Sequence, residues 1–175
     1  MATTASAAPG TPRARTKISL APNWLDRLLA AVAIVLLVMV LAALARGQAE
    51  WHRVPTFVWL HIVTIGTALA LTPVMMLRRR GDRLHRRLGR VWAGAMFLTA
   101  LFTFWIRGIN DGSLSCIHIF SAITIVQVPV IVWTARTHRH ARHRDTVRAM
   151  VAFALLTAGF FTFPFDRLLG HWLFG

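Results

Sequence analysis

The stretch LLAAVAIVLLVMVLAALA, residues 28–45, decides the class of fold because none of its side chains is polar. A helix needs about 20 mainly apolar residues to cross about 30 Å of hydrocarbon. This run is close to that length and offers no polar face to water. It therefore predicts a membrane-spanning helix.

Four further apolar runs follow along the chain, at residues 55–77, 88–106, 116–135 and 149–165. Hydrophobic residues make up 56% of the 175-residue chain and charged residues only 15%, too few charges to coat a soluble globule of this size. The connections are short, so consecutive helices should pack as antiparallel neighbours. We expect an all-α, polytopic transmembrane helical bundle with five spans over residues 24–175, preceded by a disordered basic tail over residues 1–23.

The basic residues predict the orientation, because short cytoplasmic connections of membrane proteins are enriched in Lys and Arg. Sixteen of the 20 basic residues lie before the first run or in the second and fourth connections, and four lie on the opposite side. Those four are Arg46, Arg53, Arg107 and Arg167. We expect the N-terminus in the cytoplasm and the C-terminus outside, in a multi-pass protein of the cytoplasmic (inner) membrane.

The net charge of +14 raises the question of nucleic-acid binding. The Arg residues cluster at the ends of the apolar runs, where anionic lipid headgroups attract them. The lipid bilayer is therefore the expected partner, and nucleic acid is not. Amphipathic tryptophan rings favour the same depth, and Trp24, Trp92 and Trp133 fall at expected inner ends.

The first run has a second interpretation. Ala43-Leu44-Ala45 resembles a small-residue cleavage site after the apolar part of a signal peptide. Such an apolar region normally has about 7–15 residues, and this one is longer. We favour an uncleaved span; cleavage would leave four helices in the same orientation.

Polar residues inside spans are costly in lipid and are the first place to look for function. His61, Thr64 and Thr72 share one helical face of the second run, and His118 shares a face with Ser121 in the fourth. Both histidines lie near the outer ends of their runs, on helices that point the same way. They could bind a b-type haem or a metal ion such as copper or zinc, or flank a quinone headgroup.

A cofactor at His61 and His118 would place Arg107 and Arg167 on the same outer side. Their guanidinium groups could neutralise haem propionates or a quinone's developing charge. The alternative is that each histidine hydrogen-bonds a carbonyl or a Thr hydroxyl and ties two helices together. The residues alone leave the two interpretations open, and the identity of any cofactor unknown.

The other titratable residues predict no hydrolytic site. The six acidic residues all lie at or beyond span ends, no GxSxG, HExxH or P-loop pattern occurs, and the single Cys116 excludes an internal disulfide. We interpret the segment 137–144, with His138, His140 and His143, as a solvated, lipid-facing loop rather than a metal site. Asp82 should pair with neighbouring Arg residues and cap the next helix.

Several short motifs occur in a recognisable order from His61 onward. They are His85-Arg86-Arg87-Leu88-Gly89-Arg90-Val91-Trp92, Ser115-Cys116-Ile117-His118-Ile119-Phe120-Ser121, His143-Arg144-Asp145-Thr146, and Pro164 followed by Arg167-Leu168-Leu169-Gly170-His171-Trp172-Leu173-Phe174-Gly175. In this order, over residues 61–175, the chain resembles the predicted membrane proteins of domain of unknown function 2306.

The chain departs from that family's pattern in four places. Cys116 stands where Pro is frequent, Val147 where Met is usual, and Arg107 where His can occur, and an extra residue separates Pro164 from Arg167. Arg107 cannot replace a histidine ligand, because guanidinium stays protonated. The resemblance implies a small helical-bundle membrane protein, brings no established biochemistry, and draws attention to His61, His85, His118 and Arg167.

These observations predict a non-hydrolytic helical bundle that acts as an accessory or scaffold protein. A membrane-protein partner or a second copy of the chain would then bind it. The alternative function is redox or cofactor binding by His61 and His118, and whether the protein is an enzyme stays undecided.

Overall fold

The computed structural model describes residues 21–78, 80–106, 116–164 and 167–175. This part of the chain is helical throughout and contains no strand. Residues 1–20 of the expected tail, and the candidate site residue Arg107, lie outside the described residues.

The helical elements follow the apolar runs. In chain order they are α1 (Trp24–Arg46), the 3-10 helix η1 (Gly47–Arg53), α2 (Thr56–Leu77), α3 (Arg83–Thr103), α4 (Cys116–Arg136), α5 (His140–Ala149), the π-helix η2 (Met150–Thr157), α6 (Ala158–Phe160) and α7 (Leu168–Phe174).

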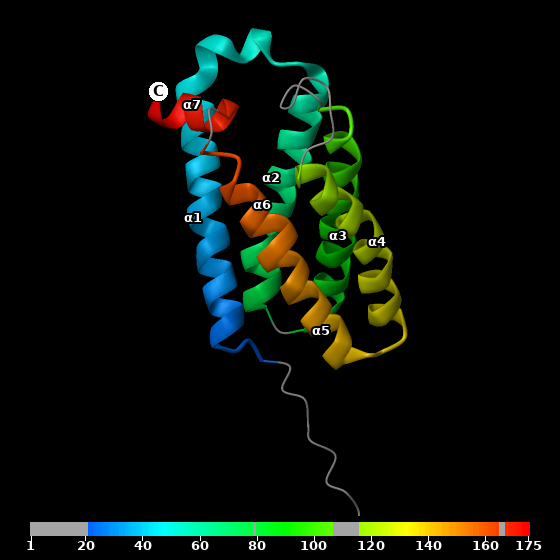
Figure 1. Cartoon of the computed structure of the whole chain (residues 1–175). Coiled ribbons are helices and arrows are strands. Elements are labelled where there is room, and N and C mark those ends of the chain that lie inside the picture. The colour runs from blue at the N-terminus through cyan, green and yellow to red at the C-terminus, as the bar shows by residue number, and fades with distance from the viewer. Residues whose placement is uncertain (1–20, 79, 107–115, 165–166) are drawn as a thin grey trace, which may run out of the picture.

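Sequential helices pack side by side, as the short connections predict. α2 packs against α1 and α3, and α3 packs against α4. α5, η2 and α6 form one helical path that crosses the bundle and contacts α4 and α1, while α7 lies across the far end of α1 (Figure 1). The start of α1 and the C-terminus therefore lie at opposite ends of the bundle (Figure 1).

Three helices in the described ranges are long and apolar enough to cross a membrane: Trp24–Arg53, Thr56–Leu77 and Ile117–Arg136. α3 and the path from α5 to α6 start earlier than predicted, at Arg83 and His140, and so each begins with a basic stretch. The interpretation of residues 137–144 as a loop is wrong beyond Arg139, because α5 starts at His140.

Side chains from the sequence pattern define where the helices begin. Asn23 accepts a hydrogen bond from the Asp26 amide, and the Asp26 side chain accepts one from the Asn23 amide, which forms a capping box at the start of α1. Asp82 caps α3 by accepting from the His85 amide at 2.6 Å, and it pairs with Arg78, as expected. Gly81 precedes this cap with a φ of 90°, a conformation that only glycine adopts without strain.

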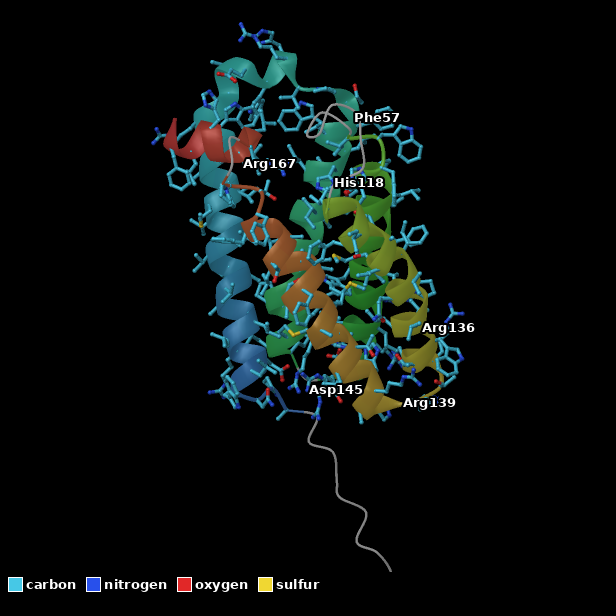
Figure 2. All side chains as sticks on the ribbon, in the orientation of Figure 1. Phe57, His118, Arg136, Arg139, Asp145 and Arg167 are labelled. Carbon is cyan, nitrogen blue, oxygen red and sulfur yellow. The ribbon has the colours of Figure 1, made fainter. Side chains whose placement is uncertain are left out.

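One end of the bundle is held by a buried ionic cluster. The Asp26 carboxylate is fully buried and accepts two hydrogen bonds of 2.9 Å from Arg148, at the end of α5. Arg80, in the connection between α2 and α3, lies 2.7 Å from the same carboxylate. Asp26 thus joins the start of α1 to two basic segments, at the end where Figure 2 shows Arg136, Arg139 and Asp145.

The opposite end is closed by α7. Trp172 is buried and donates from Nε1 to Glu50 at 3.1 Å. Its ring lies so close to Gly47 that a Cβ at this position would clash with it. A glycine at the end of α1 therefore allows α7 to approach.

We predict that Asp26→Asn strongly destabilises the bundle, because the substitution leaves Arg148 and Arg80 buried without a carboxylate. Breaking a buried ion pair typically costs about 3–5 kcal/mol. Denaturant unfolding in an uncharged detergent measures the loss. Asp145→Asn is the matched control, since Asp145 is 66% exposed and should lose less than about 1 kcal/mol; equal losses would contradict the assigned role of Asp26.

Candidate functional site at one end of α2, α3 and α4

His61 lies on the face of α2 that packs against α3. Its Nδ1 is 3.3 Å from the carbonyl oxygen of Thr99 and 3.2 Å from the hydroxyl of Thr103, both on α3. In the Nδ1–H tautomer the imidazole donates to this pair of oxygens. His61 therefore ties α2 to α3, as one of the two sequence interpretations predicts.

The other polar residues on this face of α2 bond to α3 as well. Thr64 accepts from the Thr99 hydroxyl at 2.8 Å, and Thr72 accepts from the indole N–H of Trp92 at 3.0 Å. Hydrogen bonds between membrane helices contribute on average about 0.6 kcal/mol each. The row of His61, Thr64 and Thr72 thus acts as a polar seam between two helices.

His118 lies in the first turns of α4 and is only 4% exposed. Its ring centroid is 5.6 Å from that of Phe104, which follows the last residue of α3. Ser121 does not extend this site, because its hydroxyl donates to the Ile117 carbonyl one turn back, at 3.1 Å. His118 is therefore a buried imidazole packed on an aromatic ring.

The two histidines come from different helices but contact the same end of α3. His61 contacts Thr103, the last residue of α3, and His118 contacts Phe104, the next residue of the chain. α3 packs against both α2 and α4. Axial ligation of one haem iron requires metal–nitrogen distances near 2 Å on both sides, with the porphyrin between the rings, whereas His61 Nδ1 is already engaged by Thr99 and Thr103 of α3.

The structure does not gather the remaining candidate residues around these histidines. Arg167 directly precedes α7, which packs on α1, away from His118 on α4 (Figure 2). Arg107 lies outside the described residues. Within the described ranges, no group of three or more His, Cys, Asp or Glu side chains could hold a metal ion.

A small cavity lies at the same end of the bundle but beside α1. It has a volume of about 280 Å³ and is lined by residues that include Arg46, Glu50, His171 and Trp172. None of the predicted site residues lines it. It therefore contributes nothing to a site at His61 or His118.

The histidines of the basic segments form a second group, at the end of the bundle that carries Asp26. His143, on α5, donates from Nδ1 to the carbonyl oxygen of Ile131 at 3.1 Å. Burial lowers the pKa of His143, and burial together with the nearby His143 lowers the pKa of His85. The prediction that His143 lies in a solvated loop is wrong, because His143 is half-buried in α5.

Asp26 is the residue that the sequence interpretation missed. Like the other acidic residues, Asp26 lies at or beyond the end of an apolar run, and its partner Arg148 lies 122 positions away in the sequence. The local signal was the Asn23-x-x-Asp26 spacing of a capping box, which predicts a helix start. That spacing carries no information about the two arginines.

Comparison with known proteins gave no match. No family profile, no curated protein and no solved structure is similar to the chain.

We predict that acidification destabilises the end of the bundle that carries Asp26. The pKa values of His85 and His143 are lower in the folded protein than their ordinary value of 6.5. The unfolded chain therefore binds more protons below about pH 6.5, and stability falls as pH decreases through that value toward the folded-state pKa values. The slope is at most about 1.4 kcal/mol per pH unit for each histidine.

Denaturant unfolding between pH 8 and pH 5 measures this slope. The double variant His85→Gln, His143→Gln should flatten it, while His52→Gln, at an exposed position in η1, should leave it unchanged. A slope that persists in the double variant would assign the pH dependence to other groups.

Proposed function

We propose that the protein is a five-span protein of the cytoplasmic membrane, with its N-terminus inside and its C-terminus outside, and that it serves as an accessory or scaffold subunit. The observation that carries the functional part is the polar seam between α2 and α3. Its His and Thr side chains make hydrogen bonds between helices. Groups used in this way rigidify a bundle and are not free to turn over a substrate.

The distribution of apolar side chains supports an environment of lipid or partner helices. Large apolar residues are exposed on every long helical path, among them Val35, Val63, Val91, Val126 and Phe153. A soluble monomer rarely exposes so much continuous apolar surface. The outward faces therefore suit acyl chains or the transmembrane helices of another subunit.

The inferred topology is supported by the position of the charges. Arg80 and Arg148 meet Asp26 at the start of α1, so the two Arg-rich connections share one end of the bundle with the N-terminal side. Placing that end in the cytoplasm satisfies the positive-inside rule. The resemblance to domain of unknown function 2306 stays a prediction.

Single-cysteine labelling tests the number of spans. After Cys116→Ser, we predict that Gln48→Cys reacts with an impermeant maleimide added outside intact cells, and that Arg139→Cys reacts only after permeabilisation. Both positions are exposed at opposite ends of the bundle. If only α1, α2 and α4 crossed the membrane, Arg139→Cys would react from outside.

Photo-crosslinking tests the scaffold function. With a photoreactive residue at Val126 on α4 or Phe153 in η2, both strongly exposed, we predict one discrete protein adduct in native membranes from at least one site. The adduct should persist after His61→Ala if that variant still folds. Adducts with lipid alone at every exposed face would contradict a scaffold role.

Cofactor binding is the second candidate function, favoured by one observation: His61 and His118 contact the consecutive residues Thr103 and Phe104. Absorption spectra of the purified protein, oxidised and then dithionite-reduced, distinguish the two. The scaffold function predicts no Soret band. Both proteins are expressed with ample haem. A Soret band that disappears in the double variant His61→Ala, His118→Ala would contradict the scaffold function and favour electron transfer.

A further inference from the structure

The inner end of the bundle carries more buried positive charge than Asp26, its buried carboxylate, can neutralise; the exposed Asp145 approaches Arg148 only to 3.9 Å. Asp26 faces two guanidinium groups, those of Arg148 and Arg80, whose side chains are only 12% and 14% exposed. The carboxylate oxygens are already occupied by both arginines and by the Asn23 amide. Burying an unpaired charge is unfavourable, so this arrangement calls for a further anion.

Three nitrogen atoms at this end are buried without a hydrogen-bond partner in the described part of the chain. They are Nη1 of Arg80, Nδ1 of His85 and Nε of Arg144. The nearest acidic atom to Arg144 Nε is Asp145 Oδ1 at 3.5 Å, too far for a good hydrogen bond. Buried donors are nearly always satisfied in folded proteins, so unsatisfied ones need an explanation.

The three atoms, of which His85 Nδ1 is a donor in the Nδ1–H tautomer, come from segments that meet at or near Asp26. Arg80 binds Asp26 through its other terminal nitrogen. His85 lies one helical turn into α3 and close enough to Arg80 and His143 to be influenced by their charges. Arg144 precedes Arg148 by four residues on α5, so both side chains leave the same face of that helix.

We propose that Arg80, His85 and Arg144 form a binding site for one phosphate group at the inner end of the bundle, carried by a phospholipid headgroup or present as free phosphate. A tetrahedral phosphate accepts hydrogen bonds in several directions, which suits donors from three separate segments better than a planar carboxylate does. Arg is well suited to phosphate recognition, and basic pockets at the cytoplasmic ends of membrane helices bind lipid headgroups. The site is independent of both candidate functions.

Thermal unfolding of the full-length protein in dodecyl maltoside tests the proposal. The probes are inorganic phosphate at constant ionic strength and, separately, micelles doped with phosphatidylglycerol, with diacylglycerol as the phosphate-free lipid. A saturable rise in Tm with phosphate alone shows that the free anion suffices. A rise with phosphatidylglycerol only, with co-purified lipid seen by native mass spectrometry, identifies the headgroup.

Matched variants separate a built site from general charge attraction. Arg144→Gln and His85→Gln should each raise the half-saturating probe concentration about tenfold or more, because each removes one hydrogen bond to a charged group. Arg142→Gln, the same charge change at an exposed position of α5, should leave it unchanged. Neither test variant alters the Asp26 contacts, so both should fold.

Two results would overturn the site. One is a wild-type Tm that neither probe raises beyond the effect of chloride or diacylglycerol. The other is an equal loss in Arg142→Gln and Arg144→Gln, which would reduce the effect to non-specific attraction.

Discussion

A single carboxylate, that of Asp26, fixes how three distant segments meet. It draws Arg148 and Arg80 to the start of α1, and so sets the position of the α2–α3 connection and of α5. In a bundle whose other contacts are mostly apolar, such a directional contact selects one helix arrangement among several with similar packing. The cost is desolvation of three charged groups, which makes the cluster a source of specificity rather than of large net stability.

The polar seam between α2 and α3 plays the corresponding role within the apolar layer. Lipid chains are as apolar as Leu, so apolar side chains alone give helices little reason to prefer one another over lipid. His61, Thr64 and Thr72 give α2 a defined face toward α3. This seam and the Asp26 cluster lie at different depths, and together they restrict both rotation and tilt of α2.

The helical class, the positions of the long helices and the face of α2 were predictable, because they depend on local apolarity and on spacings of three and four. Asp82 as a helix cap was predictable for the same reason. The Asp26–Arg148 pair was not, since nothing local relates residues so far apart. The expectation that tryptophan rings lie at the membrane interface fails for Trp92. Its position at the start of an apolar run predicts an interfacial ring, but the ring is buried and its N–H donates to Thr72. The relation of His61 to His118 depended on the placement of α3 between α2 and α4, which the order of helices alone does not determine.

The contacts of α1 also constrain the order of assembly. Its first turn is held by Arg148, and the η1 helix that follows it is held by Trp172. Each contact joins residues 122 positions apart. Because the chain is made from its N-terminus, α1 and α2 are complete before either of these partners has been synthesised. At that stage α1 and α2 are therefore held together mainly by apolar packing between them. α1 becomes fixed at both ends only when the later segments arrive. Contacts of such long sequence separation form late, after the entropy of closing the intervening chain has been overcome.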